Sequence, residues 1–359
     1  MGTVHYIAMD THCHSTDICV KTRANRAGRH WQVPTTIPAI REVLEQIHRP
    51  RKLTFEEGPL ADWLWRNLQE HADETLVCDP RKNALVAKDG DKDDPIDADK
   101  LCDLYIGGYL RAVHHPESLR REVMKQTVGL YHRQVRVRVQ RANQVLAYLR
   151  RWGVVVTEKD FASSSDRPEL LRRVVAGGRG GTMDAGVEAL VGTNLELLGE
   201  AYDAAVSVET RLRREVVRLG RDQEQVTRWQ ALPGIGPIRA LTLLVYLDVP
   251  GRFKSKQALW KYLGIGLVRA HSGNGAEFVH VERGANRVLK NVILGAALSV
   301  IMQGDNPFAE QYARWQTAGQ TPKNARRNVA RSLATVAWGM WKNGADYDPA
   351  RVGVAAAAQ

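Results

Sequence analysis

Cysteine is scarce in this sequence: there are four cysteines in 359 residues. Cys13, Cys19, Cys78 and Cys102 are scattered and form no recognisable paired motif. This spacing argues against a disulfide-stabilised secreted domain and favours a reduced, cytoplasmic setting. The cluster His12-Cys13-His14 has no second ligand pair at zinc-finger spacing, so we interpret it as an exposed turn.

Long apolar runs and targeting signals are also missing. No segment approaches the roughly 20 apolar residues that span a membrane. The opening residues, MGTVHYIAMD, have neither the basic region nor the long apolar region of a signal peptide. No amphipathic anchor or lipidation motif is found. We therefore expect no signal peptide and no membrane partner.

Acidic residues are outnumbered by basic ones. Against 40 Asp and Glu stand 51 Lys and Arg, for a formal net charge of +11 and a pI near 9.6. This balance predicts a polyanionic partner, and nucleic acid before a membrane. Hydrophobic residues make up 44% and charged residues 25%, as in ordinary globular proteins. The length suggests about two or three domains.

Residues 1–115 alternate strand and helix patterns. The segments 4–10 and 17–20 predict a β-hairpin that ends its first strand at Asp10, and further strands are predicted at 30–33, 52–55 and 75–78. Apolar residues at helical spacing predict helices over 38–48 and 60–71, and another begins at 93–98. Three antiparallel strands followed by alternating helices and strands is the ribonuclease-H-like order. We therefore predict an α/β domain here.

Residues 116–226 are typical of long amphipathic helices. Apolar stripes follow a spacing of three or four residues, from Met124 to Leu149 and from Leu195 to Leu219. An insert at 160–190 separates them. Within it, Ser163-Ser164-Ser165 and the Gly-rich stretch 177–181 predict a loop or a partly disordered segment. We expect an antiparallel coiled-coil hairpin. A spacer or oligomerisation arm is favoured over direct nucleic-acid contact, although arginines such as Arg133 and Arg136 line its other faces.

Residues 227–345 are predicted to be helical again, followed by a flexible tail at 346–359. Leu232-Pro233-Gly234-Ile235-Gly236 before an apolar helix is the pattern of a helix-hairpin-helix, whose glycines let backbone N–H groups approach a DNA phosphate. A tight turn between helices explains the motif equally well, and the basic balance favours DNA. The candidate nucleic-acid contacts are Gly234, Gly236, Arg239, Arg283, Arg287, Lys290, Arg133 and Arg136.

Four acidic residues form the first candidate site. Asp10 and Glu56 each follow a β-prone run, and Asp94 and Asp97 lie three apart at a helix start. First and fourth strands are neighbours in a ribonuclease-H-like sheet, so Asp10 and Glu56 can converge. Four carboxylates around one point repel unless divalent cations sit between them, which predicts Mg²⁺. For Asp94 and Asp97 alone, charges favoured by a helix N-terminus explain the pattern better. Glu57 remains an alternative to Glu56.

Ser272 is the second candidate. It lies in His271-Ser272-Gly273-Asn274-Gly275, a sequence typical of an exposed, flexible loop. A serine nucleophile needs activation, and no catalytic triad order is discernible around it. The local sequence by itself therefore favours an ordinary polar loop serine.

The ordered set of motifs resembles one known family. Asp10-Thr11, Phe55-Glu56-Glu57-Gly58-Pro59, Asp94-x-x-Asp97-Ala98, Leu232-Pro233-Gly234-Ile235-Gly236 and Ser272-Gly273 occur in the order of the DEDD transposases of the IS-one-ten type. These are bridge-RNA-guided recombinases of bacterial insertion sequences. The resemblance covers roughly residues 4–345. The family's E-A-G-P motif has alanine where this chain has Glu57, and the insert at 160–190 is another departure.

The resemblance implies a specific mechanism and set of partners. A RuvC-like domain would hold Mg²⁺ through Asp10, Glu56, Asp94 and Asp97, and a coiled coil would link it to a C-terminal transposase domain. Ser272 would attack DNA and form a 5′-phosphoserine intermediate. The implied partners are donor and target DNA, a structured noncoding bridge RNA, and further copies of the chain as a dimer of dimers. The implied location is the bacterial cytoplasm, with the nucleoid.

Two other functions fit parts of the sequence. A metal-dependent nuclease for branched DNA, similar to a Holliday-junction resolvase, would use the acidic residues with water as nucleophile and leave Ser272 idle. A non-catalytic nucleic-acid-binding protein would explain the charge without cleavage. A trapped covalent protein–DNA species separates the first from a transposase, and metal-dependent cleavage excludes the second.

Overall fold

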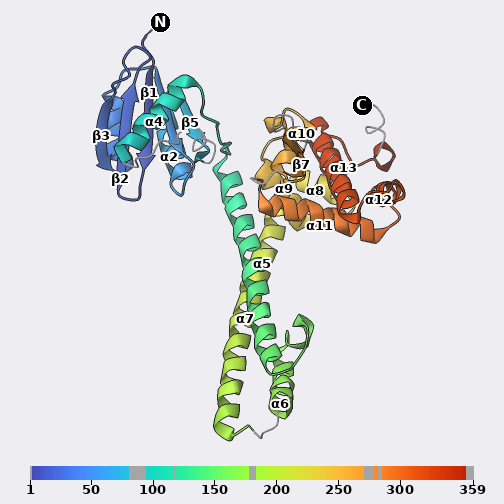
Figure 1. The fold of residues 1–359 in the computed structure, drawn as a ribbon. Helices are drawn as coiled ribbons and strands as arrows, with labels where there is room; N and C mark the ends of the chain where they lie inside the picture. Colours follow the sequence, from blue (N-terminus) through green and yellow to red (C-terminus); the bar gives the residue numbers. More distant parts are fainter. Residues whose placement is uncertain are drawn as a thin grey trace. The chain divides into compact units, whose positions relative to one another are not determined.

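The computed structural model describes residues 2–80, 94–116, 118–177, 183–270, 278–281 and 285–352. The chain forms two compact units, Met1–Pro116 and Glu117–Gln359. Within the described residues, the fold is mixed α/β and mostly helical, with one five-stranded sheet, one small hairpin and twelve α-helices. Figure 1 shows the elements of each unit.

The first unit is built on the five-stranded sheet. Its strands are β1 (His5–Thr11), β2 (Ser15–Lys21), β3 (Arg29–Pro34), β4 (Arg51–Glu56) and β5 (Glu74–Cys78). They lie in the order β3-β2-β1-β4-β5. β1, β2 and β3 pair antiparallel, and β4 runs parallel to both β1 and β5. The predicted hairpin and the predicted neighbours, first and fourth strand, are confirmed.

Helices cover both faces of this sheet (Figure 1). They are α1 (Ile37–Glu45), α2 (Ala61–Leu68) and α4 (Asp94–Gly107). Side chains alternate along β1, so Ile7 and Met9 join the core beneath α1 and α2, whereas Tyr6 and Ala8 join the core beneath α4. Even-numbered positions of β1 therefore point to the α4 side.

The second unit begins with a long helical hairpin. α5 (Leu119–Arg151) and α7 (Ala185–Arg221) pack side by side (Figure 1). Met124 and Leu149 of the predicted stripe are buried, but Val139 is 42% exposed. Its neighbour Arg138 turns to α7 instead, where Nε lies 2.7 Å from Glu209 Oε2. An ion pair thus interrupts the apolar seam that periodicity predicted.

The insert at 160–190 contains a helix that the sequence analysis did not predict. Helix α6 (Arg167–Gly177) lies within it, and α7 begins at Ala185. Leu170 and Val174, one helical turn apart, are buried in a core with Phe161 of the same segment and Val191 of α7. The glycines at 177–181 indicate a loop, but the residues before them form a helix that buries two apolar side chains.

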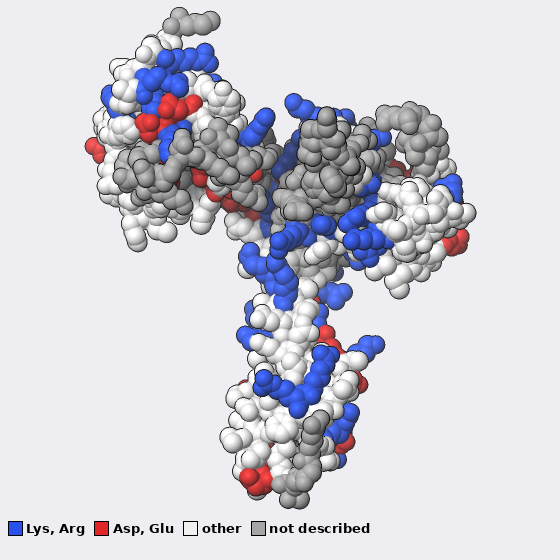
Figure 2. Space-filling view, viewed as in Figure 1, with Lys and Arg blue, Asp and Glu red and all other residues white. Residues whose placement is uncertain are grey.

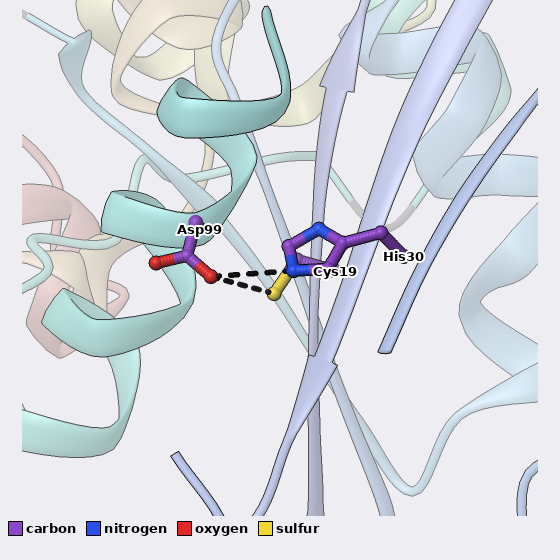
Figure 3. Close-up of side chains that lie close together, drawn as sticks. All are labelled: Cys19, His30 and Asp99. Carbon is purple, nitrogen blue, oxygen red and sulfur yellow. Dashed lines mark hydrogen bonds and ion pairs between the residues drawn. The ribbon is translucent and has the colours of Figure 1, made fainter. Parts of the chain in front are cut away.

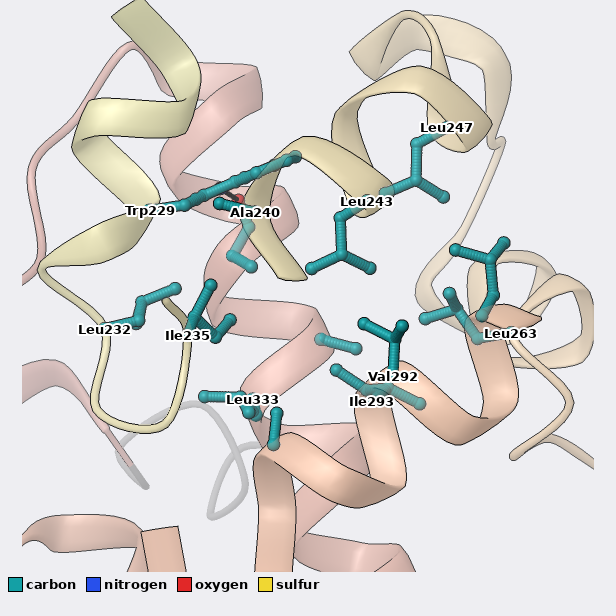
Figure 4. Packing of buried hydrophobic residues seen from close by; sticks show 14 of the residues in the cluster. Trp229, Leu232, Ile235, Ala240, Leu243, Leu247, Leu263, Val292, Ile293 and Leu333 are labelled. Carbon is teal, nitrogen blue, oxygen red and sulfur yellow. Dashed lines mark hydrogen bonds between the residues drawn. The ribbon is translucent and has the colours of Figure 1, made fainter. Parts of the chain in front are cut away.

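The rest of the second unit is a helical domain around one core (Figure 4). Its helices are α8 (Glu224–Gln230), α9 (Pro237–Leu247), α10 (Lys256–Tyr262), α11 (Arg287–Gln303), α12 (Pro307–Thr317) and α13 (Pro322–Asn343). Trp229 is completely buried, and its Nε1–H donates to Ala337 O at 2.7 Å. This bond ties α8 to α13 across the core.

Two expectations for this region are wrong. The all-helical expectation missed an antiparallel hairpin of β6 (Leu267–Ala270) and β7 (Phe278–Val281). Strands of four residues are too short for a periodic signal. The expectation of a flexible tail from 346 also fails for its described part. Tyr347 stacks on Phe308 at 6.4 Å between ring centroids, and Val352 is buried.

Within the described residues, no single helix is long and apolar enough to cross a membrane. Among these residues, the pair α11 and α12 is long and apolar enough when its two helices are taken together, although a bend of 89° separates them.

Candidate active site and nucleic-acid interface

Asp10 and Glu56 lie at the ends of adjacent parallel strands. Met9 pairs with Phe55 in the register of β1 and β4, so the next positions along the two strands are Asp10 and Glu56. Both belong to the alternating set that points to the α4 side. Asp10 is partly buried, and its Oδ2 lies 3.3 Å from His12 Nε2. Glu56 is exposed.

The direction of α4 places its N-terminus toward the same strand ends. Near the helix C-terminus, the Tyr105 ring packs edge-on against Tyr6, at the start of β1. Tyr105 Oη also donates to Glu74 Oε1 at 3.0 Å, at the start of β5. The opposite end of α4, which begins at Asp94 and carries the exposed Asp97 in its first turn, therefore lies toward the strand ends.

Asp17 is a further acidic residue at this level of the sheet, and the sequence interpretation missed it. It is the register partner of Asp10 across β1 and β2 and is only 5% exposed. Gln32 Nε2 lies 3.3 Å from one of its carboxylate oxygens and 3.4 Å from the other. An acidic residue in a β-prone run was the signal used for Asp10, and the same signal marks Asp17.

Cys19, His30 and Asp99 form a group with metal-ligand chemistry beside this region (Figure 3). Cys19 Sγ lies 3.6 Å and His30 Nε2 3.5 Å from Asp99 Oδ1. The Lys21 ammonium, which is 2% exposed, already contacts Asp99 Oδ2 at 2.8 Å. A hydrogen bond with Cys102, together with burial, raises the pKa of the Cys19 thiol. A protonated thiol and a carboxylate that is already paired with a lysine are poor metal ligands. The contacts of Asp99 with Cys19 and Lys21 instead hold α4 against the sheet.

The glycine motif forms the turn between α8 and α9. Gly234 has a φ of +75°, and a Cβ there would lie 2.7 Å from Ala296 O. Gly236 precedes α9, is exposed, and a Cβ there would meet no atom within 4 Å. The first N–H groups of a helix have no intrahelical partner. The turn thus presents open space at the N-terminus of α9, where an anion is favoured.

Substitutions at these two glycines are expected to separate folding from binding. Gly234→Ala should lower the free energy of unfolding by about 2 kcal/mol or more, because it combines strained backbone with a clash against α11. Gly236→Ala should stay within about 0.5 kcal/mol of the wild type, because the space is open. Urea denaturation measures both. Equal stabilities for the two variants would contradict the described turn.

The side chains of Arg239 and Lys290 contact other residues of the same domain. Arg239 Nη1 donates to Gly234 O at 2.6 Å and to Ser299 Oγ at 2.9 Å, and burial lowers the pKa of its guanidinium. The Lys290 side chain passes Gly264, and Arg287 at the start of α11 is exposed. Arg239 thus holds the glycine turn against α11, beside a cavity of about 730 Å³ that the turn lines.

Arg133 and Arg136 are exposed on α5 where α5 meets α9. Their charges act on Tyr246 of α9, and Lys125 Nζ lies 5.9 Å from the centre of the Tyr246 ring. Figure 2 shows several clusters of Lys and Arg on one face of the second unit. A basic surface with an aromatic ring suits a nucleic-acid backbone.

Ser272 and Arg283 lie outside the described residues. Ser272 follows β6 by two residues in the sequence, and Arg283 follows β7 by two. The described residues therefore include the two strands that flank the serine, β6 and β7.

Residues 227–313 match the model of the transposase IS116/IS110/IS902 family. The chain is 26% identical over 288 residues to a protein of Sinorhizobium fredii named as a transposase, covering 79% of this chain and 70% of that protein. It is 25% identical over 318 residues to a protein of Pseudomonas aeruginosa named as a family 20 transposase, covering 86% and 89%. The chain is thus similar to transposases, and over residues 227–313 to those of the IS116/IS110/IS902 family.

A third relative fits the same assignment. An insertion element IS110 protein of 43.6 kDa from Streptomyces coelicolor is 30% identical over 129 residues, which cover 35% of this chain and 32% of that protein. The matched segment begins in α8 and ends in α12, so it contains the glycine turn and the hairpin of β6 and β7.

Proposed function

We propose that this protein is an RNA-guided transposase that cuts and rejoins DNA through a serine nucleophile and a RuvC-like DEDD site. The observation that carries the acidic half of this proposal is the pairing of β1 with β4, which brings Asp10 and Glu56 to neighbouring strand ends on the α4 side. The match to transposases supports DNA as the substrate. The motif order supports the serine and the structured guide RNA.

The residues at the strand ends fit a divalent metal. Asp10, Glu56, Asp94 and Asp97 would supply carboxylate oxygens, the ligands that Mg²⁺ prefers. Asp10 and Asp17 face each other across paired strands, and like charges so placed repel without a cation. When bound, Mg²⁺ would supply charge stabilisation at the phosphodiester. Glu56 is preferred to Glu57, because Glu57 follows the last paired residue of β4 and falls on the opposite side by alternation.

Ser272 would carry out the bond exchange. Its Oγ attacks the phosphorus, a serine–phosphate bond forms, and the bond from phosphorus to the 3′ oxygen breaks. The 3′ oxygen leaves with a proton, and the serine proton passes to a base or to water. The result is a 5′-phosphoserine, whose phosphodiester bond conserves the energy needed for the rejoining step. We propose that the serine and the acidic site of one cut come from different protomers of a dimer of dimers.

Nucleic-acid affinity is expected to fall steeply with salt. If about six phosphates are contacted, affinity should drop roughly a thousandfold between about 50 and 200 mM salt. Replacing Arg133 and Arg136 by Gln should reduce the slope of log affinity against log salt by about 2. Replacing Arg150 and Arg151, at the far end of α5, removes equal charge as a matched control and should change the slope less. A flat salt response of the wild type would contradict the argument from charge.

The proposed function is tested by reconstitution. Purified protein, DNA carrying the element's ends, and RNA transcribed from the noncoding flank are combined with and without Mg²⁺. We expect cleavage and strand exchange only when metal and RNA are both present, with a covalent protein–DNA species on denaturing gels. Cleavage that needs metal but gives no covalent species and ignores RNA would favour the branched-DNA nuclease instead.

A further inference from the structure

We propose that a cavity between α10, α12 and α13 receives an unstacked nucleobase with its phosphate. This inference rests on the proposed function only in taking nucleic acid as the partner. The cavity has a volume of about 280 Å³ and lies within the second unit. Trp260, Gln311, Trp315 and Arg331 are among the residues that line it.

Gln311 provides an unused hydrogen-bonding group. It is 5% exposed, and its amide oxygen is buried without a hydrogen-bond partner among the described residues. An unsatisfied buried acceptor destabilises a fold, because it loses its hydrogen bonds to water and gains none in return. Such a group beside a cavity is explained if a ligand N–H donates to it. The edge of a nucleobase presents N–H donors of this kind.

Arg331 provides a cation without a counter-ion. Its Nε donates to Ile265 O and its Nη1 to Asn328 Oδ1, each at 2.8 Å. Neither partner is charged, and no carboxylate in the described part of the chain forms an ion pair with Arg331. Burial lowers the pKa of its guanidinium, as expected for a charge that no anion compensates. The remaining N–H groups suit a phosphate oxygen.

Two indoles provide flat apolar surface. The Trp260 Nε1–H is 3.1 Å from Thr335 Oγ1 and 3.2 Å from Arg331 O, which holds its ring in place. Trp315 lines the same cavity from α12. Stacking on aromatic rings accounts for much of the binding of unpaired bases. Indole, amide and guanidinium together match the three parts of a nucleotide, namely its face, its edge and its phosphate.

The cavity also adjoins the hairpin that leads to the candidate nucleophile. Ile265, whose carbonyl accepts from Arg331, precedes β6 by two residues, and Ser272 follows β6 by two. A base held here would therefore be linked through a few residues to the segment that carries the serine. Unpaired bases arise both where DNA is opened and in the loops of a structured RNA, so DNA and RNA are two sources of the same chemistry.

Gln311→Leu tests the proposal in the full-length protein. Affinity is measured for oligo(dT), oligo(rU) and an abasic deoxyribose-phosphate strand, all of equal length. The variant should bind the base-containing strands about tenfold more weakly and the abasic strand unchanged. Its stability should equal or exceed that of the wild type, because an unsatisfied acceptor is removed. Gln316→Leu makes the same chemical change elsewhere on α12. It should leave the affinity for every strand unchanged, although it removes the hydrogen bond from Gln316 Nε2 to Gln320 O.

The outcomes separate this inference from the proposed function. A loss confined to oligo(dT) or to oligo(rU) identifies the source of the base. Unchanged affinity of Gln311→Leu for every strand, or equal wild-type affinity for the abasic and base-containing strands, overturns the base pocket and leaves DNA cleavage untouched. Lower stability with unchanged affinity would assign Gln311 a structural role instead. If metal- and RNA-dependent cleavage fails while the base-specific loss is seen, the proposed function falls and the pocket stands.

Discussion

Asp10→Asn protein is expected to lose DNA cleavage by about a thousandfold or more while it still binds DNA and RNA. The substitution removes the charge at the end of β1 that faces Asp17 and neighbours the Glu56 position. Removal of a central catalytic group has effects of this size. Folding should not suffer, because a neutral amide relieves repulsion among the carboxylates. Cleavage of labelled element DNA and a parallel binding assay measure the two properties.

A matched pair of glutamates serves as the control for that result. Glu56→Gln should behave as Asp10→Asn does, whereas Glu57→Gln should keep near-normal cleavage, because alternation along β4 directs the two side chains to opposite sides. Both residues are exposed, so neither substitution should affect stability. Full activity of Asp10→Asn would remove the metal assignment. Loss of activity in Glu57→Gln alone would exchange the two glutamates.

Ser272→Ala is expected to abolish both strand exchange and the covalent protein–DNA species. A hydroxyl that forms the bond to phosphorus cannot be replaced by a methyl group. Activity should fall by about a thousandfold or more. Mixing Ser272→Ala with Asp10→Asn protein should restore partial activity, because a site shared between protomers can then be assembled from one intact serine and one intact acidic set.

Two results would revise this second prediction in different ways. If Ser272→Ala still cleaves DNA at the normal rate without a covalent species, water is the nucleophile and the nuclease interpretation replaces the transposase mechanism. If the mixture remains inactive although both variants co-assemble, the serine keeps its role and the shared site is wrong. Co-assembly is measured by co-purification of differently tagged variants.

Local sequence was sufficient to predict several features of the structure. The hairpin of β1 and β2 was predictable because two β-prone runs flank a short polar turn. The glycine turn was predictable because Gly234 needs a positive φ, which other residues rarely adopt. The seam of α5 was predicted only in part. Periodicity identified Met124 and Leu149, but Arg138 and its acidic partners displaced the expected contact of Val139.

Other features depended on contacts between distant residues. Helix α6 was missed because its apolar pair is short and lies beside glycines, and that pair is buried by residues from other segments, among them Phe161 and Val191. The register of β1 and β2 places Asp17 beside Asp10. The packing of α4 against the sheet brings Asp99 to Lys21. The cavity of Trp260, Gln311 and Arg331 is assembled from three helices that are well separated in the sequence.

The sequence by itself determined the strand and helix pattern of the first unit, the basic charge, and the order of acidic, glycine and serine motifs, because these follow from local periodicity and residue type. Only the tertiary structure decided which face of the sheet α4 covers, and hence that Asp10 shares a side with Asp17 and with the attachment of Cys19 and Lys21 to Asp99. It also decided that Gln311 is buried without a partner. The physical reason is that periodicity marks which side of an element is apolar, whereas packing decides which other element covers that side.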